Sequence, residues 1–217
     1  MNFLDYLTSA WPEILQLTIQ HLVLVGIAVG LAILIGVPLG IVMIRHRWLA
    51  SPMMGLATVI LTLPSIALFG LMIPLFSRFG QGLGPLPAIT AVFLYSLLPI
   101  MRNTYLALDG IDHGIKEAGI GIGMTFWQRL RLVDLPLSVP VILGGVRTAV
   151  VMNIGVMAVA AIIGAGGLGV LILHAISQSN MQKLVVGAVL ISVLAIVADM
   201  LLQVLQRLLT PKGMQKP

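Results

Sequence analysis

The chain has 217 residues, of which 59% are hydrophobic and only 9% are charged, and its mean hydropathy is +1.10. A soluble domain carries about a quarter of its residues as charged side chains, so this composition argues against a soluble enzyme and against a soluble nucleic-acid-binding protein. The 12 Lys and Arg residues outnumber the 7 Asp and Glu residues. In so apolar a chain, we assign the basic excess to cytoplasmic loops. No cysteine occurs in the sequence, which excludes disulfides and thiolate-held metals.

Long stretches without charge divide the chain into membrane spans. One span needs about 20 mostly apolar helical residues, and the gaps between consecutive charges leave room for five. The predicted helices cover residues 20–44, 51–76, 86–108, 138–163 and 184–206. The chain is therefore predicted to be an all-α membrane protein. Residues 1–17 form an extracytoplasmic or interfacial segment, residues 18–207 the transmembrane domain, and residues 208–217 a cytoplasmic tail.

Glycines recur at helical spacing in the first predicted span. Gly26 and Gly30 form one G-x-x-x-G pair, and Gly36 and Gly40 form a second. Small residues four apart let another helix approach closely, so we predict a packing role for both pairs.

The distribution of Lys and Arg predicts the orientation of the spans. With five spans, the two termini lie on opposite sides of the membrane. One side collects nine basic residues: Arg45, Arg47, Arg102, Lys116, Arg129, Arg131, Arg207, Lys212 and Lys216. Arg78 and Lys183 fall on the other side. Because basic loops stay in the cytoplasm, we predict an outside N-terminus, a cytoplasmic C-terminus and a cytoplasmic loop over residues 109–137.

The predicted cytoplasmic loop keeps helical apolar spacing. Four residues at i, i+4, i+7 and i+11 form one stripe: Ile111, Ile115, Ala118 and Ile122. Three glycines within residues 119–123 are expected to loosen the backbone after this helix. The segment from Thr125 to Gln128 matches the S/T-x-x-E/Q capping box, which predicts a second helix. We expect that helix to end near Pro136, because proline disfavours helix at the residue before it.

The same loop carries a seven-position motif. Seven residues fit the pattern E-A-A-x(3)-G-x(9)-I-x-L-P: Glu117, Ala118, Gly119, Gly123, Val133, Leu135 and Pro136. Gly119 replaces the second alanine, and Val133 replaces the isoleucine. The loop thereby resembles the cytoplasmic signature of ABC importer permeases with the type I transmembrane architecture. The resemblance implies a coupling helix that docks in a groove of a separate ATP-binding subunit. From the amphipathic pattern alone, a helix lying on the inner leaflet is the alternative.

A glycine-rich run follows the fourth predicted span. Its glycines form a G-x-G-x-x-G pattern: Gly164, Gly166, Gly167 and Gly169. The run follows a membrane span rather than a strand, so we reject a dinucleotide-binding site. Lipid tolerates unwound backbone only where protein buries it or where it lines a cavity. The run is therefore predicted to lie near the translocation path.

This run, together with residues 63–67 and 153–155, resembles the osmoprotectant branch of the same permeases. Members of that branch move glycine betaine, carnitine, choline or related compatible solutes, and the resemblance extends over about residues 18–207. A five-span permease for an amino acid such as methionine is the alternative. Besides the four glycines, the candidates for the path or gate are Pro64, Ser65 and Asn153.

One acidic residue, Asp199, lies within a predicted span. A charge at this depth costs a few kcal/mol unless it is paired or hydrated. Arg147 also lies within a span and is a candidate partner, although each side chain could instead reach the interface separately. The four histidines are too scattered along the chain for a metal site, and no metal is predicted.

The sequence contains no G-x-x-x-x-G-K-[ST] motif for ATP binding, so ATP and its Mg²⁺ are assigned to another subunit. We predict no enzymatic site and no cofactor on this chain. It is expected to be a multi-pass permease of the bacterial inner membrane, working in the lipid bilayer and without nucleic acid. Its expected partners are two ATP-binding subunits, a second permease subunit, identical or paralogous, and an extracytoplasmic solute-binding protein. A secondary carrier or channel that works without nucleotide is the alternative from another class.

Overall fold

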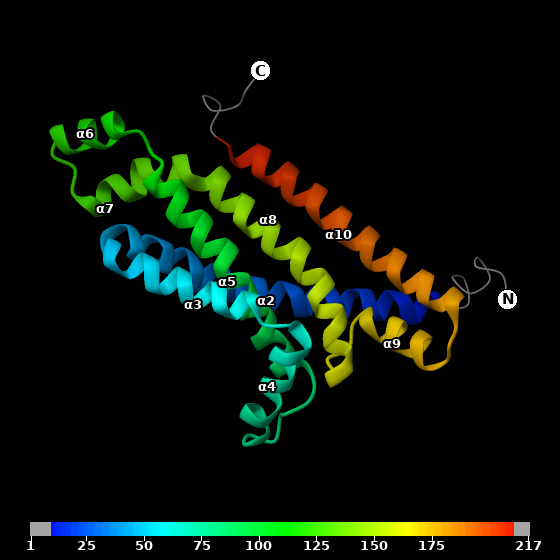
Figure 1. Cartoon of the computed structure of the whole chain (residues 1–217). Coiled ribbons are helices and arrows are strands. Elements are labelled where there is room, and N and C mark those ends of the chain that lie inside the picture. Colours follow the sequence, from blue (N-terminus) through cyan, green and yellow to red (C-terminus); the bar gives the residue numbers. More distant parts are fainter. Residues whose placement is uncertain (1–9, 211–217) are drawn as a thin grey trace.

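The computed structural model describes residues 10–210, and every element within them is helical (Figure 1). Predictions that concern residues 1–9 and 211–217 lie outside the described residues. The elements are, in chain order, α2 (Trp11–Arg45), η1 (Arg47–Leu49), α3 (Ala50–Thr62), α4 (Ser65–Ser77), α5 (Pro85–Asp109), α6 (His113–Gly121), α7 (Phe126–Arg129), η2 (Leu130–Asp134), α8 (Leu135–Val159), η3 (Ala160–Ile163), α9 (Gly169–Ser177) and α10 (Met181–Leu209).

Helices of membrane-spanning length confirm the predicted fold class. Within residues 10–210, α2, α5, the segment Phe126–Ile163 and α10 are each long and apolar enough to cross a membrane. The bent pair formed by Arg47–Thr62 and Ser65–Ser77 provides a fifth span if it counts as one. The first helix starts earlier than predicted, at Trp11 rather than at residue 20. Pro12 fits in its first turn, where a missing N–H removes no intrahelical hydrogen bond.

The second predicted span is not one helix. α3 ends at Thr62 and α4 begins at Ser65, with a bend of 101° between them, so the prediction of one helix over residues 51–76 is wrong. Leu63 adopts an extended conformation before Pro64, as expected for a residue that precedes proline. The Tyr95 hydroxyl donates to the carbonyl oxygen of Leu63 at 2.7 Å, which satisfies a polar group that the break releases. Figure 1 shows α4 turned away from α3.

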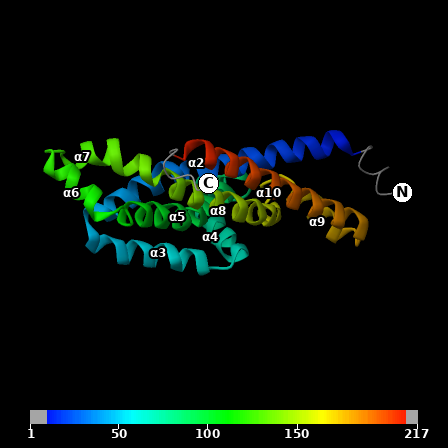
Figure 2. The ribbon, with the colours of Figure 1, turned by 90° about the horizontal axis from the view of Figure 1, so that it is seen from above.

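The core lies where α2, α5 and α8 meet, and Figure 2 shows α5 between α3 and α2. A Cβ on Gly40 would lie 2.6 Å from Cβ of Thr104, and one on Gly36 would lie 3.1 Å from another α5 side chain. These glycines therefore allow α2 and α5 to approach, as predicted. A Cβ on Gly26 or Gly30 would meet nothing within 4 Å. No helix within residues 10–210 therefore packs against Gly26 or Gly30, and the packing role of that pair stays a prediction.

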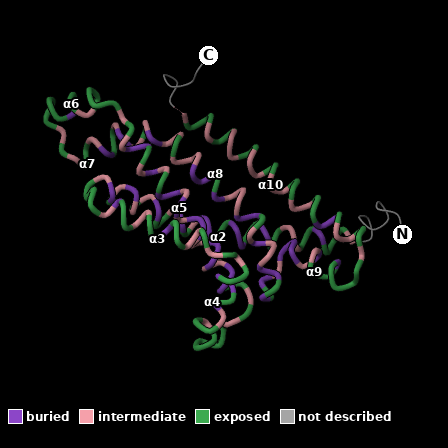
Figure 3. The backbone as a smooth tube through the Cα atoms, viewed as in Figure 1, coloured by how far each residue is buried: buried purple, intermediate pink, exposed green. Residues whose placement is uncertain are grey.

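Burial is uneven among the spans. The apolar window of α10 is only 11% buried, whereas that of α5 is 56% buried. Figure 3 shows the buried residues concentrated on α2, α5 and α8, while α10 is mostly exposed or intermediate. An exposed apolar helix needs lipid or another protein to cover it. Within the described residues, α10 packs chiefly against α8 and α9, and much of its surface is left for lipid or another protein to cover.

Candidate functional site

The loop that carries the seven-position motif lies at one end of the molecule, beside the C-terminal end of α2 (Figure 1). Its first helix, α6, is capped by Asp112, whose Oδ1 accepts hydrogen bonds from the N–H groups of Gly114 at 2.8 Å and Ile115 at 3.4 Å. The glycines at 119 and 121 remain helical, contrary to our prediction. Only Gly123, with φ of +83°, makes the turn that follows α6. The sharp turn therefore depends on one glycine.

The predicted capping box is confirmed. The backbone N–H of Gln128 donates to the Thr125 hydroxyl at 3.3 Å, and the side chain of Gln128 accepts from the backbone N–H of Thr125 at 2.9 Å. The predicted end of this helix near Pro136 is wrong, because the chain continues through a π-helical turn into α8. Pro136 occupies the first turn of α8, and the wider π turn accommodates a residue without an N–H. The second helix of the loop and the following span are thus one continuous helical segment.

The side chain of Arg129, from the helical segment that follows, packs against α6. Its Nε donates to Oδ2 of Asp134 at 3.1 Å, and the side chains of this pair are only 14% and 5% exposed. The stem of Arg129 lies against α6, because a Cβ on Gly119 would be 3.2 Å from Cδ of Arg129. An alanine at position 119 would therefore push on the arginine by a few tenths of an ångström. The close contact explains why glycine fits where the motif has alanine.

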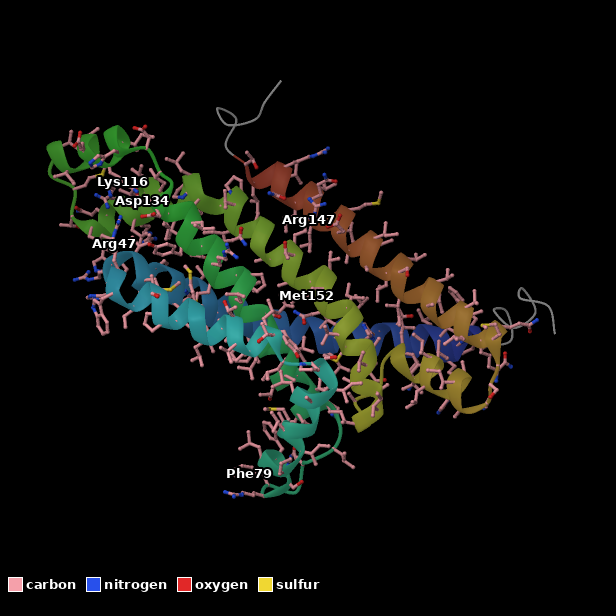
Figure 4. All side chains as sticks on the ribbon, in the orientation of Figure 1. Arg47, Phe79, Lys116, Asp134, Arg147 and Met152 are labelled. Atoms are coloured by element: carbon pink, nitrogen blue, oxygen red, sulfur yellow. The ribbon has the colours of Figure 1, made fainter. Side chains whose placement is uncertain are left out.

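Several contacts connect the loop, the end of α5 and the segment at the end of α2. Nη2 of Arg47 donates to Oδ1 of Asp109 at 2.9 Å, and Nζ of Lys116 donates to the backbone oxygen of Asp109 at 3.0 Å. The Arg45 guanidinium lies 5.5 Å from the centre of the Phe126 ring. Figure 4 labels Arg47 and Lys116 at this end of the molecule. Exposed ion pairs contribute little stability, so these contacts matter chiefly as connections between α2 and the loop.

The exposed residues of α6 and of the turn after it combine one acid with apolar side chains. The Glu117 side chain is 69% exposed and lies 3.6 Å from His113, one turn earlier. Three isoleucines on and after this helix are also exposed: Ile115, Ile120 and Ile122. Of the other motif residues, Ala118 is exposed beside Glu117, Gly119 is buried, Gly123 forms the turn, Val133 and Leu135 are half-buried, and Pro136 is exposed. The motif thus spans an exposed helix and the start of the next span.

The glycine-rich run is unwound, as predicted. Gly164 ends η3 with φ of +78°, and Gly166 and Gly167 have φ of +88° and +73°. The N–H of Gly167 donates to Oε1 of Gln20 on α2 at 3.0 Å. Side chains of α2 therefore satisfy backbone groups that a helix would otherwise satisfy.

His21 is a buried residue of this region to which the sequence analysis assigned no role. It is fully buried, its Nδ1 accepts from the N–H of Leu168 at 3.3 Å, and its Nε2 lies 3.0 Å from the carbonyl oxygen of Ile154. Since a backbone N–H only donates, Nδ1 carries no proton and Nε2 donates to Ile154. A Cβ on Gly167 would lie 2.8 Å from Nδ1, which leaves room only for glycine. A polar side chain in an otherwise apolar span was the signal that could have identified it.

The other path candidates are not brought together. Asn153 is fully buried and donates to Oγ of Ser96 at 2.7 Å, so it belongs to the core. Pro64 and Ser65 lie at the bend between α3 and α4. Gly169 borders an apolar cavity of about 520 Å³ between α8, α9 and α10. Within residues 10–210, the structure therefore places these candidates in three different environments.

The two intramembrane charges form an ion pair. Nη2 of Arg147 on α8 donates to Oδ2 of Asp199 on α10 at 2.6 Å, and Nε of the same arginine donates to Oδ1. Separate snorkelling of the two side chains, the alternative that the sequence left open, is not what the structure contains. In the described part of the chain, no group of three His, Cys, Asp or Glu side chains is arranged to hold a metal.

The helical spans define a multi-pass membrane protein. The family model of the binding-protein-dependent transport system inner membrane component matches residues 29–212, and the chain belongs to this family.

Curated relatives cover nearly the whole chain. It is 63% identical to the osmoprotectant import permease protein OsmW of Salmonella typhimurium, over 99% of this chain and 100% of that protein. It is 41% identical to the glycine betaine/carnitine/choline transport system permease protein OpuCB of Bacillus subtilis, over 99% of this chain and 96% of that protein. Among solved structures, an inward-facing MetNI methionine ABC transporter matches with a TM-score of 0.83 at 22% identity, covering 91% of this chain and 96% of that chain. That last likeness concerns the fold alone.

Proposed function

We propose that the chain forms half of the pore of an ABC importer for quaternary-amine compatible solutes, and that α6 is its coupling helix. The outer face of α6 docks on an ATP-binding subunit, where Glu117 pairs with basic groups and the exposed isoleucines are buried. Apolar burial contributes about 25 cal/mol per Å² to such a contact. The single observation that carries this proposal is the exposed acidic and apolar surface of α6, a helix joined at its base to the end of α5 through Lys116.

The solute class rests on the relatives. Those with 41% and 63% identity over nearly the full length are named for osmoprotectants, or for glycine betaine, carnitine and choline. The methionine transporter is similar at only 22% identity, so the amino-acid alternative has less support. We therefore propose glycine betaine, carnitine, choline or a similar solute as the cargo.

The assembly that we propose places the chain in the bacterial inner membrane, with the N-terminus outside and both α6 and the C-terminus in the cytoplasm. Two such permeases, identical or paralogous, face each other across a twofold axis, and an extracytoplasmic binding protein delivers the solute. ATP and Mg²⁺ bind to two separate ATP-binding subunits, so hydrolysis takes place on those chains. The excess of basic residues on the α6 side supports this orientation.

In the transport cycle that follows, closure of the ATP-binding subunits moves α6 and favours the outward-facing state. Such a shift requires contacts that differ between the two states, and the α6 surface would supply them. The unwound glycine run and the bend at Pro64 are proposed to border the solute path near its outer end. Hydrogen bonds from the side chains of Gln20 and Tyr95 satisfy backbone groups there, which allows irregular backbone at that depth.

The test compares two charge reversals in proteoliposomes that contain the permease, its ATP-binding subunits and the binding protein. Glu117→Lys reverses the charge on the α6 surface, and Glu13→Lys makes the same change at the exposed start of α2. We expect Glu117→Lys to abolish ATP-driven uptake and the stimulation of ATP hydrolysis by the loaded binding protein. Glu13→Lys should retain both. Normal uptake by Glu117→Lys would reject the coupling role, and uptake driven by an ion gradient without ATP would reject the importer class.

A further inference from the structure

The ion pair between α8 and α10 is partly exposed. Arg147 binds both carboxylate oxygens of Asp199, yet the two side chains remain 31% and 33% exposed. A charge within a span is ordinarily paired and turned toward the protein interior or a hydrated cavity. The partial exposure of this pair therefore means that a second ligand can reach it.

The pair borders an open groove of about 530 Å³. Among the described residues that line this groove, only Arg147 and Asp199 are charged. The nearby polar side chains are already engaged with backbone oxygens: Thr148 donates to Gly144 at 3.0 Å, and Gln206 donates to Pro140 at 2.7 Å. The groove thus presents one positive and one negative group, side by side, in otherwise neutral surroundings.

The groove continues along one face of α8. Thr148 and Met152 line it and also line a second groove of about 370 Å³, which Arg102 and Asn103 of α5 border. Further along the same helix, Gly155 borders the apolar cavity near α9. The segment from residue 144 to residue 155 is about 16 Å long at the helical rise of 1.5 Å per residue. Figure 4 labels Arg147 and Met152 on this stretch of α8.

We propose that Arg147 and Asp199 form a transit site for zwitterionic solutes in this groove. The guanidinium of Arg147 binds the carboxylate of the solute, and the carboxylate of Asp199 binds its quaternary ammonium group. This proposal rests on the proposed function and narrows it to the zwitterionic members of the solute class, such as glycine betaine and carnitine.

Pairing of charges explains why a zwitterion fits. When such a solute enters, it replaces one internal ion pair by two ion pairs, so no charge in the span is left without a partner. A solute with a single positive charge, such as choline, pairs with Asp199 and leaves Arg147 unpaired. A charge that is left without a partner within a span is costly. The site therefore favours zwitterions over cations of the same headgroup, and it resists the entry of simple ions.

A cysteine-protection experiment tests the site without the binding protein. The chain contains no cysteine, so Met152→Cys introduces a single thiol into this permease. In the detergent-purified complex with the ATP-binding subunits, a fluorescent maleimide labels this thiol, and the label is read on the permease band. We expect saturating glycine betaine to slow labelling at least fivefold and choline to slow it less than twofold. Equal protection by the two solutes, or none, would overturn the proposal.

Single substitutions then distinguish a solute-binding site from an ion pair that only holds α8 and α10 together. With Arg147→Gln in the Met152→Cys chain, the protecting solute should change from glycine betaine to choline, because only Asp199 remains charged. With Asp199→Asn, protection by choline should be lost entirely. A mere tether predicts that each substitution alters labelling equally with either solute. Retained preference for glycine betaine in Arg147→Gln would equally reject the site.

A double variant addresses the possibility that a single charge substitution prevents assembly of the complex. Arg147→Met with Asp199→Met replaces the ion pair by apolar side chains, a change that proteins often tolerate. We expect this variant to assemble with the ATP-binding subunits and to lose protection and glycine betaine uptake at least tenfold. Wild-type uptake would show that the charges act only as a tether. Stimulation of ATP hydrolysis by the binding protein, measured in parallel, reports on the proposed function separately from the site.

Discussion

Replacement of His21 by leucine tests the contact between α2 and the glycine-rich run. The side chain is fully buried, and its ring joins the N–H of Leu168 to the carbonyl oxygen of Ile154. Leucine keeps much of the volume but removes both hydrogen bonds. A buried polar group that loses its partner costs about 1–3 kcal/mol, and two groups are affected here. After the gain from burying an apolar side chain, we expect a net destabilisation of about 3 kcal/mol.

The assay is thermal unfolding of the purified chain in detergent, followed by the loss of helical signal. For a chain of this size, 1 kcal/mol corresponds to about 2–4 °C, so His21→Leu should lower the Tm by about 6–12 °C. His21→Gln is the control, because its amide can both donate and accept; we expect it to lose less than half as much. A Tm for His21→Leu within 2 °C of the wild type would refute the anchoring role. Equal losses in the two variants would show that ring shape, rather than hydrogen bonding, matters.

Two further predictions concern packing and capping. Gly40→Ala should destabilise the chain by about 1–3 kcal/mol, because its Cβ would lie 2.6 Å from Cβ of Thr104. Gly26→Ala, whose Cβ would meet nothing within 4 Å, should not destabilise it. Thermal unfolding compares the two variants, and equal effects would contradict the α2–α5 contact. Thr125→Ala removes the N-cap of α7, worth about 0.5–2 kcal/mol, and should weaken co-purification of the ATP-binding subunits by loosening the support of α6, while Thr125→Ser retains the cap. Unchanged co-purification of Thr125→Ala would show that the α7 cap does not help to position α6.

Local signals in the sequence predicted the features that depend on local physics. The gaps between charges located the spans, because the apolar length of a helix must match the bilayer. The capping box at Thr125 and Gln128 predicted the start of α7, because both hydrogen bonds join residues three apart. Positive φ in the run around Gly166 followed from the tolerance of glycine for that conformation.

Features decided by distant partners could not be read from the sequence. Pro64 and Pro99 both lie within predicted spans, yet only Pro64 separates two helices, while Pro99 lies inside the continuous helix α5. At the break before Pro64, the hydroxyl of Tyr95, a residue distant in the sequence, donates a hydrogen bond to the carbonyl oxygen of Leu63. Likewise, Gly26 and Gly40 share the same local motif, but only Gly40 has a helix against it. In both cases, the tertiary neighbour determines the outcome.

The continuity of the helix from the loop to the ion pair links the two proposals. Phe126–Ile163 is one helical segment of 38 residues, with Arg129 beside α6 near one end and Arg147 further along. At 1.5 Å per residue, these two arginines are separated by about 27 Å of helix. If α6 couples to the ATP-binding subunits as proposed, movement of α6 displaces this helical segment through the contact with Arg129. Asp199 lies on α10, which packs chiefly against α8 and α9, so a displacement of α8 acts directly on the contact between Arg147 and Asp199. Such a shift would open the Arg147–Asp199 pair and expose both charges to a solute at the moment when the ATP-binding subunits close.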